Sequence, residues 1–179
     1  FEVYIQPFVK TTSKTIIGFE CLSRQFKIND LDIREIVTSL ERSGRIKVFD
    51  YHILRTSFQY LMKINKKYPD IFIAVNISPI NINHDLYYYI IQLLEEFKIN
   101  PNNLVIEVLE SESLNKNSNS IEVITSLSQL GIRISVDDFG TGYSSLETIS
   151  KLPLNFLKVD KSYFTNLQKD SFEQILLLS

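Results

Sequence analysis

The chain has 179 residues, of which 44% are hydrophobic and 22% charged, and its formal net charge is -2. This composition is typical of a globular domain with a substantial core and excludes an intrinsically disordered chain. The lysines and arginines are scattered, so we expect no nucleic-acid polymer as a partner. No apolar run approaches the roughly 20 residues that cross a bilayer, and we expect no membrane insertion by this segment.

The single cysteine and the two ends indicate the setting of the chain. Cys21 has no second cysteine with which to form a disulfide, which favours a reducing compartment and a cytoplasmic location. The chain starts at Phe1 without a methionine and ends in an apolar run at 175–178 that no glycine or proline stops. We therefore expect both ends to be cuts from a longer parent protein, which could itself be anchored in a membrane.

The first part of the sequence predicts a hairpin followed by two helices. Residues 2–9 and 15–22 have the composition of strands and are separated by a polar turn. Apolar residues at helical spacing then predict helices over 31–42 and 48–67, the second of which ends before Pro69.

From residue 71 onward, short apolar runs alternate with helical patterns. The predicted strands lie at 71–77, 104–108, 132–136 and 155–159. One of the helices between them is expected to end at Gly131, and a short helix to begin near Ser144. Strands rich in Ile, Val and Leu that alternate with helices predict an α/β protein with a parallel sheet covered on its outside, either a barrel or a doubly wound sheet.

Five predicted strands carry a polar residue where their apolar run ends. These residues are Glu20, Asn76, Glu107, Asp137 and Lys158. Strand alternation would turn these side chains to one face, which in a barrel is the inside. Because β/α barrels build their active sites at the carboxyl ends of different strands, the pattern predicts a site at that end.

The carboxylates in this set predict a metal site. Glu20, Glu107, Asp137 and the adjacent Asp138 would repel one another if crowded together, so they must take up protons or bind cations. Oxygen donors of this kind, with the Asn76 amide, suit Mg²⁺, Mn²⁺ or Ca²⁺, whereas the lack of clustered His and Cys argues against zinc.

The residues around the predicted metal site suggest a reaction. Two metals sharing Asp137 would activate water for displacement at phosphorus, so phosphoester hydrolysis is the hypothesis. Lys158 would add positive charge beside the water or the phosphate, and Arg24 could hold a phosphate oxygen.

The motifs of this chain resemble, in order and spacing, those of EAL-domain phosphodiesterases. The matching segments are Gln6-Pro7, Glu20-Cys21-Leu22-Ser23-Arg24, Val75-Asn76-Ile77-Ser78, IEVLES at 106–111, DDFGTGYSSL at 137–146 and Leu157-Lys158-Val159-Asp160. The resemblance implies a TIM-like β/α barrel with an antiparallel first strand. It also implies hydrolysis of cyclic di-GMP to linear pGpG with two divalent ions, Mg²⁺ or Mn²⁺, in bacterial signal transduction.

The same resemblance implies roles for individual residues. Those similar to metal ligands are Glu20, Asn76, Glu107 and Asp137, with Asp138 for a second metal. Lys158 is similar to the lysine that activates water. The resemblance implies that Lys158, Glu20 and Asp138 are the catalytic residues. Those similar to substrate-contacting residues are Gln6, Arg24 and Asp160. Those similar to residues that couple a loop to a dimer interface are Glu110, Gly140 and Gly142.

The chain departs from the family pattern in a few places. Cys21, Gln25 and Leu109 replace an alanine, an aromatic residue and a threonine, and the family's later glutamate and glutamine have no counterpart. We therefore expect residues 1–179 to be a partial EAL domain that lacks the last two strands of its barrel and is inactive alone.

Two functions remain open at this point. The first is a cyclic-di-GMP phosphodiesterase, and the alternative is a catalytically inactive EAL domain that serves as a cyclic-di-GMP receptor or a protein-interaction scaffold. Besides cyclic di-GMP, the expected partners are a second copy of the chain in a homodimer and an N-terminal sensor or GGDEF domain in the parent protein.

Overall fold

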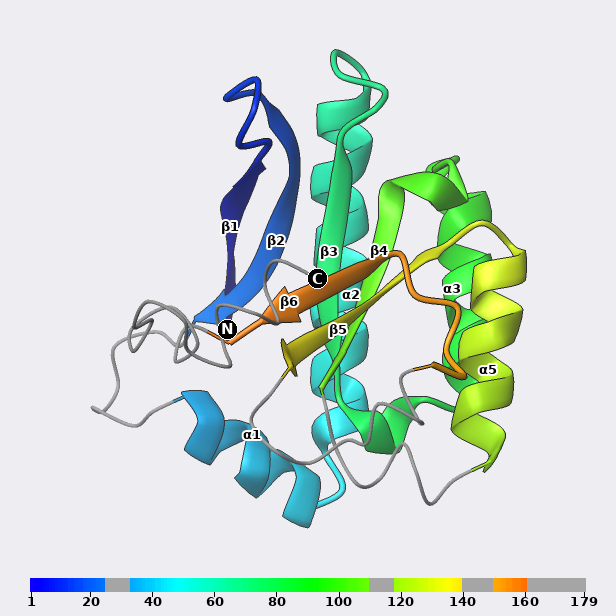
Figure 1. The fold of residues 1–179 in the computed structure, drawn as a ribbon. Helices are drawn as coiled ribbons and strands as arrows, with labels where there is room; N and C mark the ends of the chain where they lie inside the picture. Colours follow the sequence, from blue (N-terminus) through cyan, green and yellow to red (C-terminus); the bar gives the residue numbers. More distant parts are fainter. Residues whose placement is uncertain (25–32, 110–117, 140–149, 161–179) are drawn as a thin grey trace, which may run out of the picture.

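The structure is a computed structural model of the 179-residue chain, and it describes residues 1–24, 33–109, 118–139 and 150–160. Its strands form one sheet in the order β1-β2-β3-β4-β5-β6 (Figure 1). They are β1 Glu2–Val9, β2 Ile16–Arg24, β3 Phe72–Ile77, β4 Leu104–Leu109, β5 Arg133–Phe139 and β6 Phe156–Val159. The first strand is antiparallel to the second, and every later pair is parallel. The predicted hairpin and parallel strands are therefore confirmed.

The helices follow the predicted alternation. They are α1 Ile33–Arg42, α2 Ile46–Asn65, α3 His84–Phe97 and α5 Ser118–Gln129, with 3-10 turns η1 Pro79–Asn81 and η2 Pro101–Asn103. Helix α3 begins where the Asn83 side chain accepts hydrogen bonds from two backbone N–H groups, and Gly131 follows α5 with a φ of +95°. The short helix expected near Ser144 lies outside the described residues. Among the described helices, none has the length and hydropathy to span a membrane.

Strand alternation separates the side chains of the sheet into two apolar layers. Side chains such as Val75 on β3, Ile106 on β4 and Ile134 on β5 pack with α2, α3 and α5 in the larger core, where Cys21 also lies. The opposite face carries a smaller cluster around Phe72. The replacement of the family alanine by Cys21 therefore faces the helices, as the parity of β2 predicts.

The sheet is strongly curled around its inner face. Glu20 on β2 and Lys158 on β6 are four strands apart, which in a flat sheet would separate them by about 19 Å. Their side-chain atoms Oε1 and Nζ are nevertheless 3.2 Å apart. Over the residues that the structure describes, the sheet is thus a six-stranded half-barrel with its helices outside, and the prediction of an incomplete TIM-like barrel is confirmed.

Gly18 leaves room inside the half-barrel for the ring of Phe72. The two residues pair across β2 and β3, and a Cβ atom at Gly18 would lie 2.5 Å from the ring. We expect Gly18→Ala to lower the free energy of unfolding by about 2 to 3 kcal/mol, because the buried ring must move. Urea unfolding of the wild type and the variant would measure this change in the free energy of unfolding.

A control for this prediction is Gly44→Ala, at a position with φ of +69° and no described atom within 4 Å of the added Cβ. Its cost should come from backbone strain alone, about 1 kcal/mol. Equal costs for the two substitutions would show that the contact with Phe72 does not matter.

Candidate active site

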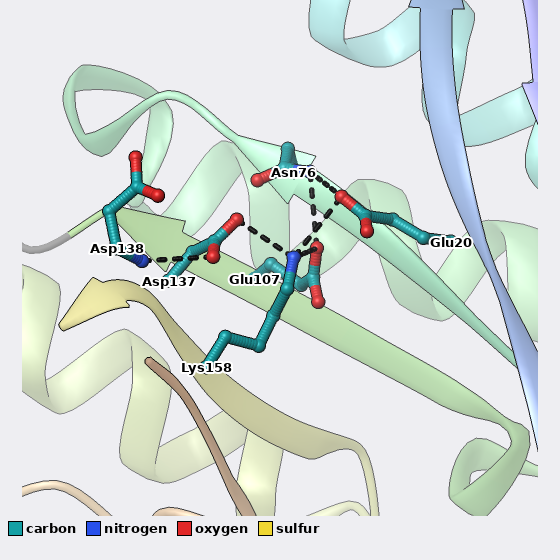
Figure 2. A network of polar contacts seen from close by, with 6 residues as sticks. All are labelled: Glu20, Asn76, Glu107, Asp137, Asp138 and Lys158. Atoms are coloured by element: carbon teal, nitrogen blue, oxygen red, sulfur yellow. Dashed lines mark hydrogen bonds and ion pairs between the residues drawn. The ribbon is translucent and has the colours of Figure 1, made fainter. Parts of the chain in front are cut away.

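The polar side chains predicted at the strand ends meet at the carboxyl end of the half-barrel (Figure 2). Asn76 Nδ2 donates hydrogen bonds to Glu20 Oε1 and to Glu107 Oε2, each at 3.1 Å. Carboxylate oxygens of Glu20, Glu107 and Asp137 lie within 4.8 Å of one another. Parallel strands bring their carboxyl ends to one edge, and the curl of the sheet turns that edge into an arc around the cluster.

Lys158 places its ammonium group among the three carboxylates. Its Nζ atom is 3.2 Å from Glu20 Oε1, 3.1 Å from Glu107 Oε2 and 2.8 Å from Asp137 Oδ2. The Glu107 side chain is only 1% exposed, and that of Lys158 is 24% exposed. One ammonium therefore faces three crowded carboxylates, and the cluster favours a further cation.

The crowding shifts the proton affinity of two groups. Burial raises the pKa of Glu107 to about 8, and the nearby charge of Glu20 adds to the effect. The side chain also borders a largely apolar cavity of about 220 Å³. Burial alone would lower the pKa of Lys158, but Glu107, Asp137 and Glu20 together raise it above its ordinary value. Lys158 consequently stays an ammonium group at neutral pH and acts as a hydrogen-bond donor.

Asp138 is next in sequence but points away from the cluster in Figure 2. The pairing of β5 with β6 shifts between Val136 and Phe139, which marks a bulge. Asp138 has a φ of +56°, in the left-handed region, and its N–H donates to Asp137 Oδ1 at 2.9 Å. Bulges redirect side chains, so Asp137 joins the cluster while Asp138 lies beside it.

The residues with predicted substrate contacts lie on the elements that surround the cluster. Gln6 is exposed and pairs with Glu20 across β1 and β2. Arg24 ends β2, is exposed and donates from Nη1 to the preceding carbonyl at 2.9 Å. Asp160 follows β6, and its N–H donates to a β5 carbonyl at 3.3 Å. The predicted loop and dimer residues Glu110, Gly140 and Gly142 lie outside the described residues.

The cluster has the donors that a hard divalent cation requires. Glu20, Glu107 and Asp137 supply carboxylate oxygens from three strands at a spacing that one ion could bridge. Asn76 now turns its Nδ2 toward two carboxylates, so its amide would have to turn over to present Oδ1 to a cation. The acidic group could hold a metal ion, and its oxygen chemistry fits one.

One buried carboxylate beside this site, that of Asp50, was not predicted from the sequence. Asp50 on α2 is 3% exposed and accepts hydrogen bonds from the Ser78 N–H and the Asn81 side chain. A signal was present, because Asp50 stands at helical spacing from Ile46 and Leu54, on the face of α2 that faces the core. An acidic residue on such a face needs partners in the fold.

Fold and site together define a β/α half-barrel with an acidic, cation-attracting centre at the carboxyl ends of its strands. Residues 1–178 match the family model described as EAL domain. The chain therefore belongs to the EAL domain family.

Curated relatives and solved structures support this assignment. The chain is 30% identical over 173 residues to the bifunctional diguanylate cyclase/cyclic di-GMP phosphodiesterase MucR of Pseudomonas aeruginosa, a match that covers 94% of this chain and 25% of that protein. The EAL enzyme Bd1971 in its cAMP and cyclic-di-GMP bound form superposes with a TM-score of 0.89 and 26% identity over 98% of this chain and 50% of that chain. PaMucR phosphodiesterase in complex with c-di-GMP superposes with a TM-score of 0.85 and 28% identity over 98% of this chain and 76% of that chain.

The chain is shorter than the curated proteins that it matches. It spans between a fifth and a third of their length. Almost the whole of this chain nevertheless matches MucR and a second relative, named as the probable cyclic di-GMP phosphodiesterase PdeB of Escherichia coli.

Proposed function

We propose that the protein is a cyclic-di-GMP phosphodiesterase that hydrolyses its substrate to linear pGpG with two divalent ions, Mg²⁺ or Mn²⁺. The observation that carries the proposal is the convergence of Glu20, Asn76, Glu107, Asp137 and Lys158 at the carboxyl end of an EAL-family half-barrel. In this proposal residues 1–179 form one partial EAL domain, which is cytoplasmic and inactive without the rest of the barrel.

The cluster residues would hold the ions and the attacking water. Glu20, Glu107 and Asp137, with Asn76 after its amide has turned, are the proposed ligands of one ion. Asp138 would bind the second ion after a change of side-chain direction, since it now faces away from the cluster. Bound ions would polarise the phosphodiester and supply a nucleophilic water.

Lys158 would position the water and stabilise the negative charge on the phosphoryl oxygens. Its ammonium group already lies 2.8 Å from Asp137 Oδ2, and its raised pKa keeps it a donor. In the reaction the water oxygen forms a bond to phosphorus and the bond from phosphorus to a ribose oxygen breaks. The attacking water gives up one proton and the leaving ribose oxygen takes one, so water is added across the broken bond and the linear dinucleotide forms.

The surrounding residues would contact the dinucleotide. Arg24 can offer two donors to a phosphate, and Gln6 and Asp160 have hydrogen-bonding groups suited to a guanine or ribose edge. Glu110, Gly140 and Gly142 keep their proposed role in coupling a loop to a homodimer. A GGDEF or sensor domain in a longer parent would supply the signal.

Chromatography of cyclic di-GMP after incubation with the complete native protein and Mn²⁺ or Mg²⁺ tests the proposal. We expect pGpG to form, and Glu20→Ala to abolish it because one carboxylate ligand is lost. Glu95→Ala, an exposed change on α3, should leave turnover unchanged. Binding of cyclic di-GMP without turnover would instead assign the protein to the receptor class, and neither binding nor turnover would refute the proposed function.

A further inference from the structure

The buried carboxylate of Asp50 links helix α2 to the turn that follows strand β3. Its Oδ2 atom accepts a hydrogen bond from the Ser78 backbone N–H at 3.0 Å and another from Asn81 Nδ2 at 2.6 Å. Asp50 and Asn81 are 3% and 5% exposed. Both ends of the η1 turn are thus attached to one side chain of α2.

This turn begins directly after the strand that carries Asn76. Strand β3 ends at Ile77, and Ser78 is the residue before the η1 turn, where the N–H groups have no helical partner. Asn76 in turn bridges Glu20 and Glu107 through Nδ2. Ser78, whose N–H is bonded to Asp50, therefore lies only two residues after Asn76, whose side-chain amide is at the centre of the site.

We propose that Asp50 is a positioning residue that fixes the β3–η1 turn and thereby holds the Asn76 amide between the carboxylates of Glu20 and Glu107. The inference rests on the proposed function, because the purpose of that amide is to help to bind a divalent cation. Residues that orient a metal ligand in this indirect way commonly change metal affinity by 10- to 100-fold when they are replaced.

Three variants separate positioning from simple stabilisation. Asp50→Ala removes both hydrogen bonds to the turn. Asp50→Asn keeps the shape and an oxygen that can accept both of them. Asn103→Ala is the matched control: the Asn103 side chain is also buried and donates two hydrogen bonds, to Asn65 Oδ1 and to the Pro69 carbonyl, before the start of β4.

Two readouts on the complete native protein test the inference. The first, without metal, is hydrogen exchange at the Ser78 amide, which should accelerate in Asp50→Ala and stay slow in Asp50→Asn and Asn103→Ala. The second is Mn²⁺ titration by calorimetry, in which Asp50→Ala should weaken binding by about 10- to 100-fold while Asp50→Asn restores it and Asn103→Ala leaves it unchanged.

The outcomes distinguish failure of the positioning role of Asp50 from failure of the proposed phosphodiesterase function. Equal Mn²⁺ affinity in Asp50→Ala and Asn103→Ala would overturn the positioning role, and so would unaltered exchange at Ser78 in Asp50→Ala. A wild-type protein that binds no Mn²⁺ would refute the proposed function instead, while hydrogen exchange would still decide whether Asp50 holds the turn.

Discussion

Replacing Glu107 by glutamine is expected to stabilise the metal-free protein at pH 8 and to abolish its metal-dependent activity. Glu107 is 1% exposed, and its pKa is raised to about 8, so ionisation of this group opposes folding. Glutamine has the same shape and an oxygen that can accept the hydrogen bonds from Asn76 and Lys158. It carries no charge, so the proposed cation loses one of its anionic ligands.

The pH dependence of folding stability shows why Glu107→Gln should stabilise the protein. Between the ordinary pKa of 4.5 and about 8, the folded wild type keeps a proton on Glu107 that the unfolded chain has released. Wild-type stability therefore falls as pH rises through this range, and Glu107→Gln should escape the loss. At pH 8 we expect a gain of about 2 to 4 kcal/mol in the free energy of unfolding.

Urea unfolding in a metal chelator at pH 5 and pH 8 would measure the effect. The matched control is Glu96→Gln, which changes a partly exposed glutamate paired with Arg55 and should shift stability by less than about 1 kcal/mol at either pH. A Glu107→Gln variant that is less stable than wild type at pH 8 would contradict the burial argument.

Replacing Lys158 by methionine should have the opposite effect on stability. The change leaves the charged carboxylates of Glu20 and Asp137, and the buried Glu107 carboxyl group between them, without their common ammonium partner. We expect the metal-free protein to lose about 2 to 4 kcal/mol at neutral pH, and added Mn²⁺ to restore part of it, because a cation replaces the missing charge. Turnover of cyclic di-GMP should fall by about 10² to 10⁴-fold, since the donor beside the water is gone.

Thermal unfolding with and without Mn²⁺, followed by the hydrolysis assay, would check this prediction. The control is Lys47→Met, which removes an exposed ion pair with Asp85 and should cost less than about 1 kcal/mol with no dependence on Mn²⁺. If Lys158→Met behaved like Lys47→Met in both assays, Lys158 would have no part in the site.

The sequence predicted the helices and strands of the described residues and the convergence of the polar side chains at the strand ends. Apolar runs and helical spacing are local signals, and polar residues such as Glu20 and Glu107 stand out where a run ends. Their convergence then follows from the parallel order of the strands, since carboxyl ends meet at one edge.

What the sequence did not predict depends on contacts between distant segments. The bulge at Asp138 arises from the pairing of β5 with β6, so simple alternation fails there. The helical spacing of Asp50 indicates a core-facing side chain, but its two donors come from the turn after β3, which is distant in sequence. The place of Lys158 among the carboxylates likewise required the curl of the whole sheet.

Anomalous diffraction at the manganese edge, from crystals of the complete native protein grown with Mn²⁺, tests the central claim most directly. We predict a manganese peak bounded by carboxylate oxygens of Glu20, Glu107 and Asp137, with Asn76 Oδ1 turned toward it. A peak elsewhere, or no peak while Lys158 keeps its contacts with all three carboxylates, would contradict the assignment of this cluster as the metal centre.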